Sequence, residues 1–268
     1  MSGPLVELRG VHKAFGALKV LDGIDLAFER GKTTVILGPS GTGKSVMLKH
    51  IVGLLRPDQG EVDFDGRRVD HLPESELVEV RKRVGFLFQM GALFDSMSVG
   101  ENVAFPLREH TPMTPAERRD RAEILLRQVG LPDIQHKLPA ELSGGQRKRV
   151  ALARAVALDP DLVLYDEPTT GLDPIRADVI NELINALRDH TGITGIAVTH
   201  DMQSANRIAD RMVLLHSGRV LCDDEPDAFR SSDSDTVQRF IHGQADEDDL
   251  AAIRAGFGQS ETSTSASS

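Results

Sequence analysis

The sequence lacks paired cysteines and long apolar runs. Cys222 is its only cysteine, which excludes an internal disulfide and a cysteine-based zinc site and indicates a reducing compartment. No stretch approaches the roughly 18 apolar residues that a membrane helix needs, and the longest candidate, Val84–Phe94, contains Gln89. Glu7 and Arg9 stand where a signal peptide would be apolar. We therefore expect a chain that neither crosses a membrane nor is exported.

A basic surface is also missing. The 268 residues carry 31 Lys or Arg against 41 Asp or Glu, a formal net charge of −10. Most of the excess acid lies in residues 222–268, so the rest of the chain is close to neutral. This balance argues against a protein that coats nucleic acid, because phosphate neutralisation needs clustered Lys and Arg. The apolar fraction of 40% is ordinary for a globular chain of one or two domains.

Apolar runs alternate with amphipathic stretches between residues 5 and 221, which predicts an α/β domain. Buried strands are expected at Thr33–Leu37, Val84–Phe88, Leu162–Tyr165 and Gly195–Thr199. Leu5–Val11 and Val20–Phe28 alternate apolar and polar residues instead, which is typical of an antiparallel sheet with one solvated face.

Residues 90–160 have a helical pattern. A capping box joins Thr114 to Glu117 at the start of one expected helix, and Gly130 is its stop signal. A second helix is expected from Ser143 to a point before Asp159. We therefore predict a helical subdomain inserted into the α/β core.

A glycine-rich loop follows the expected strand Thr33–Leu37. Residues 38–45 read GPSGTGKS, which matches a phosphate-binding loop, and a helix is expected over Val46–Val52. Glycines let backbone N–H groups turn toward phosphate oxygens, and a helix N-terminus adds positive potential. The pattern predicts that Lys44 reaches the β- and γ-phosphates and that Ser45 binds Mg²⁺. A flexible loop without a ligand is the alternative, which the strand–loop–helix context disfavours.

Two adjacent acids, Asp166 and Glu167, end the apolar run Leu162–Tyr165. In a protein with a phosphate-binding loop, the first acid holds Mg²⁺ opposite Ser45. Adjacent strand residues point to opposite faces of a sheet, so Glu167 is expected to act instead as general base for the attacking water. For an isolated Asp-Glu pair, a solvated strand end is the alternative.

Residues 142–146 read LSGGQ and are the most diagnostic stretch. Ser143 and Gln146 form a capping box, which is a sufficient reason for a helix to start here. It does not explain Gly144 and Gly145, because glycine in the first turn lowers helix propensity. Bare amides at a helix N-terminus bind anions, so this turn is a second candidate phosphate site.

Along the chain the phosphate-binding loop comes first, LSGGQ second and the Asp166-Glu167 pair third. In that order the three motifs resemble those of the ATP-binding subunit of an ABC (ATP-binding cassette) transporter, over about residues 5–242. The resemblance implies a P-loop NTPase of the α/β class, with an antiparallel β subdomain, an inserted all-helical subdomain, and ATP and Mg²⁺ as cofactors. We expect an ATPase domain over residues 1–245, a short acidic amphipathic extension over 246–258 and a disordered tail over 259–268.

The resemblance also implies roles for the matching residues. Phe15 stacks on adenine, Gln89 touches Mg²⁺ and leads into the helical subdomain, and His200 senses the γ-phosphate. The implied catalytic residues are Glu167, His200, Gln89 and Lys44, and the implied metal ligands are Ser45, Gln89 and Asp166. The implied nucleotide contacts are Phe15, Gly38, Pro39, Ser40, Gly41, Thr42, Gly43, Lys44, Ser45, Val46, Ser143, Gly144, Gly145, Gln146 and Asp173.

Two copies of such a subunit meet head to tail, so the resemblance implies a homodimer. ATP then lies between the Lys44 loop of one copy and the Ser143–Gln146 turn of the other, with Asp173 in a loop that crosses the interface. Closure and reopening of the dimer drive a rigid-body stroke. The pore must come from a separate multi-spanning permease, which places the chain on the cytoplasmic face of a bacterial inner membrane.

Further strings narrow the transporter class. Phe88–Phe94 (FQMGALF), Ser98–Pro106 and Phe240–Gly243 resemble the ATPases of MCE-type lipid transporters, such as the Mla phospholipid system. That resemblance implies an MCE-domain partner and a small regulatory subunit. The ATPase subunits of amino-acid and metal importers share many of these sequence motifs, so an importer of that kind remains an alternative. So do ABC ATPases that act on DNA or ribosomes, although the chain has neither a second cassette nor basic arms, and a P-loop kinase, which would leave LSGGQ without a purpose.

Met90–Gly100 is rich in apolar residues for a loop region. We expect Leu93, Phe94 and Met97 to line a groove that accepts a short cytoplasmic helix of the permease, because such patches rarely stay uncovered. The alternative places them in the core of the helical subdomain. Past Gly243, the acidic run Asp246–Asp249 precedes an amphipathic pattern that could fold onto its own domain, dock on the partner ATPase or stay disordered.

Overall fold

The computed structural model describes residues 3–245 and residue 251. The chain divides into two compact units, Met1–Pro226 and Asp227–Ser268, whereas the predicted boundary stood at residue 245. The expected extension over 246–258 and tail over 259–268 lie outside the described residues, apart from Ala251. Within the described part of the chain, no helix is long and apolar enough to span a membrane.

Two sheets frame the first unit. One is a six-stranded sheet of order β10-β9-β3-β8-β7-β6, parallel from β9 to β6 and closed by the antiparallel hairpin of β9 and β10. Its strands are β3 Thr33–Leu37, β6 Val84–Leu87, β7 Leu162–Asp166, β8 Thr194–Thr199, β9 Arg211–His216 and β10 Arg219–Asp224. The other is antiparallel, of order β2-β1-β4-β5. Its strands are β1 Val6–Phe15, β2 Leu18–Phe28, β4 Gln59–Phe64 and β5 Arg67–Arg68.

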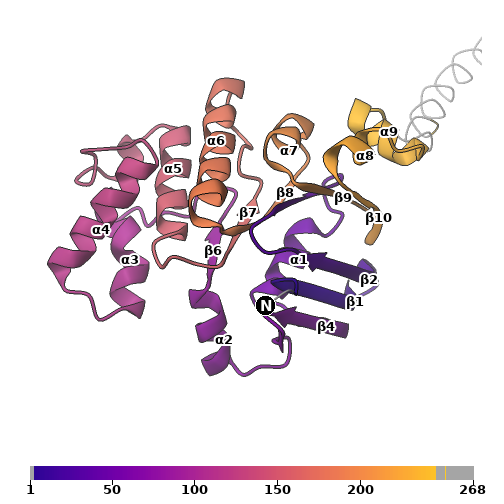
Figure 1. Ribbon diagram of the computed structural model, residues 1–268, viewed down its shortest axis with the longest axis horizontal. Helices are drawn as coiled ribbons and strands as arrows, with labels where there is room; N and C mark the ends of the chain where they lie inside the picture. The colour runs from indigo at the N-terminus through magenta and orange to yellow at the C-terminus, as the bar shows by residue number, and fades with distance from the viewer. Residues whose placement is uncertain (1–2, 246–250, 252–268) are drawn as a thin grey trace, which may run out of the picture. The chain divides into compact units, whose positions relative to one another are not determined.

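The helices of the first unit group by position (Figure 1). Helices α3, α4 and α5 gather on one side, away from β1, β2 and β4. The bounds are α1 Lys44–Ile51, α2 Glu74–Lys82, α3 Val99–His110, α4 Pro115–Gln128, the 3-10 turn η1 Pro139–Glu141, α5 Gly144–Ala155, α6 Pro174–Thr191 and α7 Met202–Ile208. In the second unit the structure describes α8 Pro226–Arg230, which starts at the boundary residue, and α9 Asp235–His242.

The expected α/β architecture is confirmed, and the four predicted buried strands match their predicted bounds to within one residue, while β1 runs on to Phe15 and β2 begins at Leu18. The strand predicted to end at Phe88 ends at Leu87, and the strand predicted from Gly195 begins at Thr194. The alternating segments pair antiparallel as expected, with Val6 opposite Phe28 and one face of β1 buried. Helix α1 begins at Lys44 rather than at Val46, so Lys44 and Ser45 belong to its first turn.

The helical region holds one helix more than was expected. Helix α4 has the predicted Thr114–Glu117 capping box, and α5 has the predicted Ser143–Gln146 box. Helix α3 was missed, although Ser98 and Glu101 form a third capping box at its start. Pro106 inside α3 concealed it, because proline removes a helical hydrogen bond and is read as a helix breaker.

One apolar core joins the two sheets of the first unit around α1. Met47, Leu48 and Ile51 of α1 are fully buried and belong to the same cluster as side chains of β1 and β7, among them Leu8 and Leu164. Burial of this kind contributes about 1.5–3 kcal/mol for each large apolar side chain. The core therefore fixes the helix whose first turn carries Lys44 and Ser45.

Candidate functional site

A cavity of about 410 Å³ lies at the N-terminus of α1. Its lining brings together ten residues that the sequence predicted, from five separate parts of the chain. These residues are Phe15, Ser40, Gly41, Gly43, Lys44, Ser45, Val46, Gln89, Glu167 and His200. Val20 of β2 also lines the cavity and was missed, because nothing in the sequence separates it from the other apolar residues of its strand.

The backbone of the loop before α1 needs glycine at two positions. Gly38 has φ +150°, and a Cβ there would lie 2.2 Å from the carbonyl oxygen of Leu215. Gly43 has φ +97°, and a Cβ there would lie 2.9 Å from both the carbonyl oxygen and Cγ1 of Val20. A side chain at either position would collide with a neighbouring strand or its end. The glycines therefore let the loop pack closely enough to turn its amides toward the cavity.

Two of the polar side chains at the start of α1 are already oriented. Lys44 Nζ donates to the carbonyl oxygens of Gly38 at 2.7 Å and Pro39 at 2.9 Å, which folds the loop around the ammonium group. Ser45 Oγ donates to Asp166 Oδ1 at 2.9 Å. Burial lowers the pKa of Lys44, and the charges of Glu167 and Asp166 oppose this shift. Burial raises the pKa of Asp166, mainly against the hydrogen bond from Ser45, while the charge of Glu167 adds to the shift. The Ser45 hydroxyl and the Asp166 carboxylate form an oxygen pair of the type that hard divalent cations prefer.

Glu167 adopts an uncommon backbone conformation with φ +49°, just beyond the last residue of β7. The separation from Asp166 therefore comes from a left-handed residue and not from the strand alternation that the sequence suggested. A left-handed non-glycine residue costs about 1–3 kcal/mol and persists only where its surroundings hold it. Here its amide donates to Val198 and its carbonyl oxygen accepts from Lys148 Nζ and from the amide of Thr170.

The Glu167 carboxylate faces the cavity and is held by three side chains. Its Oε1 lies 3.0 Å from Nδ1 of His200, which follows β8. Its Oε2 accepts from the hydroxyls of Thr170 at 2.9 Å and Thr199 at 3.3 Å. A carboxylate fixed in this way can accept a proton from water in the cavity. Thr170 and Lys148 were not predicted, because their contacts with Glu167 depend on the turn that follows β7.

The other predicted residues lie outside this cavity. Ser143 Oγ accepts from the Gln146 amide and the Ser143 amide donates to Gln146 Oε1, so both side chains cap α5. Asp173 caps α6 by accepting from the amide of Arg176. Ser143, Gly145 and Gln146 line a hollow of about 110 Å³ of their own. Within one chain, the LSGGQ turn and the Lys44 loop therefore form two separate surfaces.

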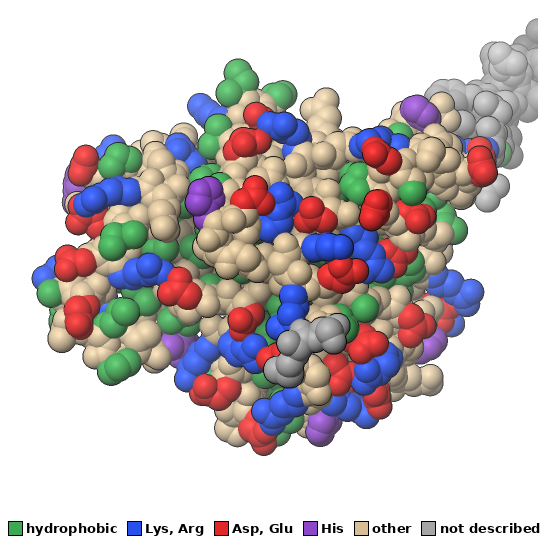
Figure 2. Space-filling model, viewed as in Figure 1, with side chains coloured by type: hydrophobic (Ala, Val, Ile, Leu, Met, Phe, Trp, Pro, Cys, Tyr) green, Lys and Arg blue, Asp and Glu red, His purple; other side chains and the backbone are tan. Residues whose placement is uncertain are grey.

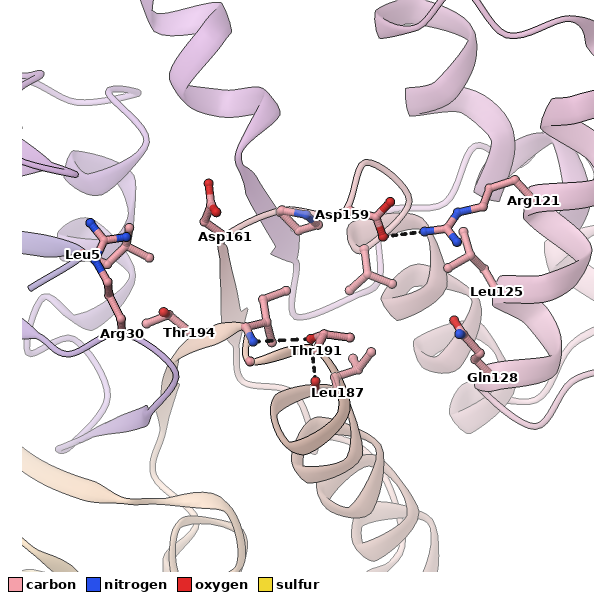
Figure 3. A pocket seen from close by; sticks show the side chains of 14 residues that line it. Leu5, Arg30, Arg121, Leu125, Gln128, Asp159, Asp161, Leu187, Thr191 and Thr194 are labelled. Carbon is pink, nitrogen blue, oxygen red and sulfur yellow. Dashed lines mark hydrogen bonds and ion pairs between the residues drawn. The ribbon is translucent and has the colours of Figure 1, made fainter. Parts of the chain in front are cut away.

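A third cavity, of about 360 Å³, contains none of the predicted residues (Figure 3). Its charged groups are all paired, with Arg121 on Asp159, Arg30 on Asp65 and Asp161 on Arg83. Thr191 is satisfied by the carbonyl of Leu187. The lining thus leaves no uncompensated charge for a charged ligand.

Residues 21–170, more than half of the chain, match the family model described as ABC transporter. The chain belongs to the ABC transporter ATP-binding family. It is therefore an ATP-hydrolysing cassette with the fold of that family, as the motifs implied.

Similarity to named cassettes extends over most of the chain. The intermembrane phospholipid transport system ATP-binding protein MlaF of Haemophilus influenzae is 42% identical over 92% of this chain and 93% of its own length. MlaF of Escherichia coli K12 is 41% identical over 90% of both chains. A probable ribonucleotide transport ATP-binding protein, mkl of Mycobacterium leprae, is 41% identical over 90% of this chain and 70% of its own length.

Solved structures agree with the fold of this cassette. A dimer of the ATP-binding cassette MJ0796 in a post-hydrolysis state with ADP and Pi is 36% identical, with a TM-score of 0.76 over 82% of this chain and 98% of that one. CbiO1 of Clostridium perfringens, part of the transporter complex cbiONQ, is 29% identical with a TM-score of 0.79 over 86% of this chain and 92% of that one.

Proposed function

We propose that this cassette is the ATPase subunit of a membrane transporter that moves phospholipid, of the MCE or Mla type. The observation that carries the proposal is the 42% identity to a phospholipid transport ATPase over 92% of this chain and 93% of that protein. The ribonucleotide transport relative matches with similar identity but over 70% of its length. Import of amino acids or metals is the next alternative, since the ATPase subunits of such importers have many of the same sequence motifs.

In the proposed site, Lys44 and the loop amides bind the β- and γ-phosphates, and Phe15 stacks on adenine. Phe15 is 49% exposed at the mouth of the cavity, where a base can cover it. Ser45, Asp166 and Gln89 would hold Mg²⁺, whose charge offsets that of the phosphates when it is bound. Glu167 accepts a proton from the attacking water, and His200 beside it contacts the γ-phosphate.

The second half of the site comes from another copy in this proposal. Ser143–Gln146 present the amides of the first turn of α5, and Asp173 begins α6, yet neither lines the Lys44 cavity of its own chain. A head-to-tail homodimer would bring the Ser143 turn of each chain to the ATP of the other. The dimeric MJ0796 cassette, similar over 82% of this chain, supports this arrangement.

A second groove is a candidate binding surface for the permease. A cavity of about 500 Å³ is lined by α2, β6, α3 and α5, with Phe94 at its edge, 41% exposed. Phe94 packs on Phe105 with ring centroids 4.7 Å apart. Leu93 and Met97, which the sequence placed with Phe94, are half-buried and do not line the groove. We propose that a short cytoplasmic helix of the permease inserts here, since exposed aromatic side chains anchor interfaces.

The proposal places the chain at the cytoplasmic face of a bacterial inner membrane, attached through its permease. An MCE-domain protein and a small regulatory subunit complete the complex. On the face of the molecule in Figure 2, Lys and Arg are interspersed with Asp and Glu, which disfavours nucleic acid as a partner.

Reconstitution tests the substrate. The cassette, its permease and the MCE-domain protein are purified together and placed in vesicles that contain fluorescent phosphatidylethanolamine. ATP-dependent movement of the fluorescent lipid between membranes is expected, and a Lys44→Ala cassette should abolish it. ATP-dependent uptake of labelled ribonucleotide, amino acid or metal without lipid movement would overturn the phospholipid proposal while leaving the ATPase assignment intact.

A further inference from the structure

Lys148 is a buried cation that the mechanism above does not use. It lies on α5, five residues after Ser143, and only 6% of it is exposed. Its neighbours in the sequence differ, since Arg147 is exposed and Arg149 half-buried. Burial lowers the pKa of Lys148 to about 8, against the opposing effect of the charges on Glu167 and Asp166. Burying a charged ammonium group costs free energy, so we expect Lys148 to make an interaction that compensates for this cost.

The ammonium group is directed at the backbone of the proposed base. Lys148 Nζ donates to the carbonyl oxygen of Glu167 at 3.0 Å. The same oxygen also accepts from the amide of Thr170, at the longer distance of 3.3 Å. A charged donor at the shorter distance makes the stronger of the two bonds. Lys148 is therefore a principal support of the carbonyl of Glu167.

This bond matters because Glu167 is left-handed, with φ +49°. A strained residue of this kind keeps its conformation only while its surroundings hold both the amide and the carbonyl. The amide is held by Val198 of β8, and the carbonyl by Lys148 of α5. If the carbonyl were released, the peptide unit could rotate, and the carboxylate would move relative to the cavity.

The bond also connects two parts of the chain that would contact different ATP molecules in the proposed dimer. Helix α5 starts with the Ser143 turn, which would face the ATP bound by the partner. Glu167 faces the cavity of its own chain. A helix moves as a stiff unit, so a shift of its first turn reaches Lys148 little more than one turn further along.

We propose that Lys148 is a positioning residue, which fixes the backbone of Glu167 to the helix that carries the LSGGQ turn. When the first turn of that helix contacts the partner's nucleotide, the resulting shift of the helix thereby changes the position of Glu167 in the same chain. The inference rests on the proposed role of Glu167 as general base. It assigns to Lys148 no contact with the nucleotide or with the reacting atoms.

The test compares steady-state ATP hydrolysis by the full chain and its Lys148→Met variant. Methionine keeps the length of the side chain but lacks the charge and the donor. We expect kcat to fall about 10- to 100-fold, which a displacement of the base by about 1 Å would cause, with KM for ATP changed less than about twofold. ADP affinity, measured by titration calorimetry, should stay at the wild-type value. Lys148→Arg, which restores a cationic donor, should recover part of kcat.

Two controls separate positioning from folding. Lys148→Met removes the cost of burying an ammonium group, and the carbonyl of Glu167 keeps the amide of Thr170 as a donor, so the melting temperature should stay close to the wild-type value. The control is Arg56→Met, which removes another cation that donates to a backbone carbonyl, that of Leu72 at 2.9 Å, and that lines none of the cavities described above. This variant should change the melting temperature without changing kcat.

The outcomes distinguish this inference from the function it rests on. Glu167→Gln is measured in parallel, and if it keeps its turnover, the base role fails and the inference fails with it. If Glu167→Gln is inactive but Lys148→Met hydrolyses ATP with wild-type kcat, only the positioning role is overturned. Loss of ADP affinity or of folding in Lys148→Met, without recovery in Lys148→Arg, would reduce Lys148 to a structural residue and also overturn the proposal.

Discussion

Acid sensitivity of helix α1 can be predicted from one side chain. His50 lies in the last turn of α1 and is fully buried. Its Nδ1 lies 2.7 Å from the carbonyl oxygen of Val46. Because a carbonyl can only accept, Nδ1 carries the proton and Nε2 carries the lone pair. Among the described residues, Nε2 has no hydrogen-bond partner. Burial lowers the pKa of His50, and the charge of Lys13 acts in the same direction; the backbone carbonyls of Val46 and Arg56 and the charge of Asp58 oppose the shift.

The sign of the effect follows from proton linkage. The unfolded chain titrates near the ordinary histidine value of about 6.5, while the folded pKa of His50 lies below its usual range. Below pH about 6.5 the unfolded state therefore binds more protons, so the free energy of unfolding decreases as the pH falls toward the folded pKa. One proton gives a slope of at most about 1.4 kcal/mol per pH unit. Above pH about 7 the contribution of neutral His50 is fully present.

The variant His50→Leu removes this titration together with the orphan Nε2. We expect its free energy of unfolding, relative to wild type, to rise by up to about 1.4 kcal/mol between pH 7.5 and 5.5, as measured by urea unfolding. The matched control is His190→Leu, since His190 makes the same bond to the carbonyl four residues earlier, at 2.8 Å, but is exposed. An identical wild-type-to-variant difference at both pH values would refute the reasoning.

The remaining predictions concern the proposed site and its partners. Glu167→Gln should lower kcat by about 10²–10⁴-fold while keeping ATP affinity, so that size-exclusion chromatography with ATP finds a stable dimer; turnover near the wild-type rate would contradict the base role. Ser143→Arg should abolish hydrolysis yet leave nucleotide affinity of the monomer unchanged, and a loss of that affinity would exclude action on the partner's ATP. Phe94→Asp should abolish capture by the permease without lowering the melting temperature, whereas a large decrease would place Phe94 in the core.

The nucleotide cavity was predictable because its residues lie in short segments with their own physical requirements. The loop before Lys44 needs glycine at Gly38 and Gly43, and the turn at Ser143 carries its cap and its bare amides within five residues. Such requirements are visible in the sequence without knowledge of distant contacts. The assembly of Phe15, Gln89 and His200 around the same cavity came from the resemblance to a family, since each is an unremarkable residue by itself.

The errors have the opposite origin, in contacts that are distant in the sequence. The conformation of Glu167 depends on Val198 and on Lys148, which are 31 and 19 residues away along the chain. The sequence analysis assigned nothing to Lys148, because three consecutive basic residues, Arg147 to Arg149, do not show which of them the packing of α5 buries. Leu93 and Met97 do not line the groove that Phe94 lines, although all three are apolar and lie within five residues.

In the proposed mechanism, the distribution of the site within one chain makes hydrolysis depend on assembly. A single chain presents Lys44, Ser45, Asp166 and Glu167 already in hydrogen-bonded positions, so it can bind a nucleotide without a partner. The anion-binding turn at Ser143 lies elsewhere on the same chain and can reach an ATP only across an interface. Under this proposal, binding and turnover are separated in space, and a permease would control turnover by controlling how two cassettes meet. The bond from Lys148 to Glu167 is the point in each chain where these two halves are joined.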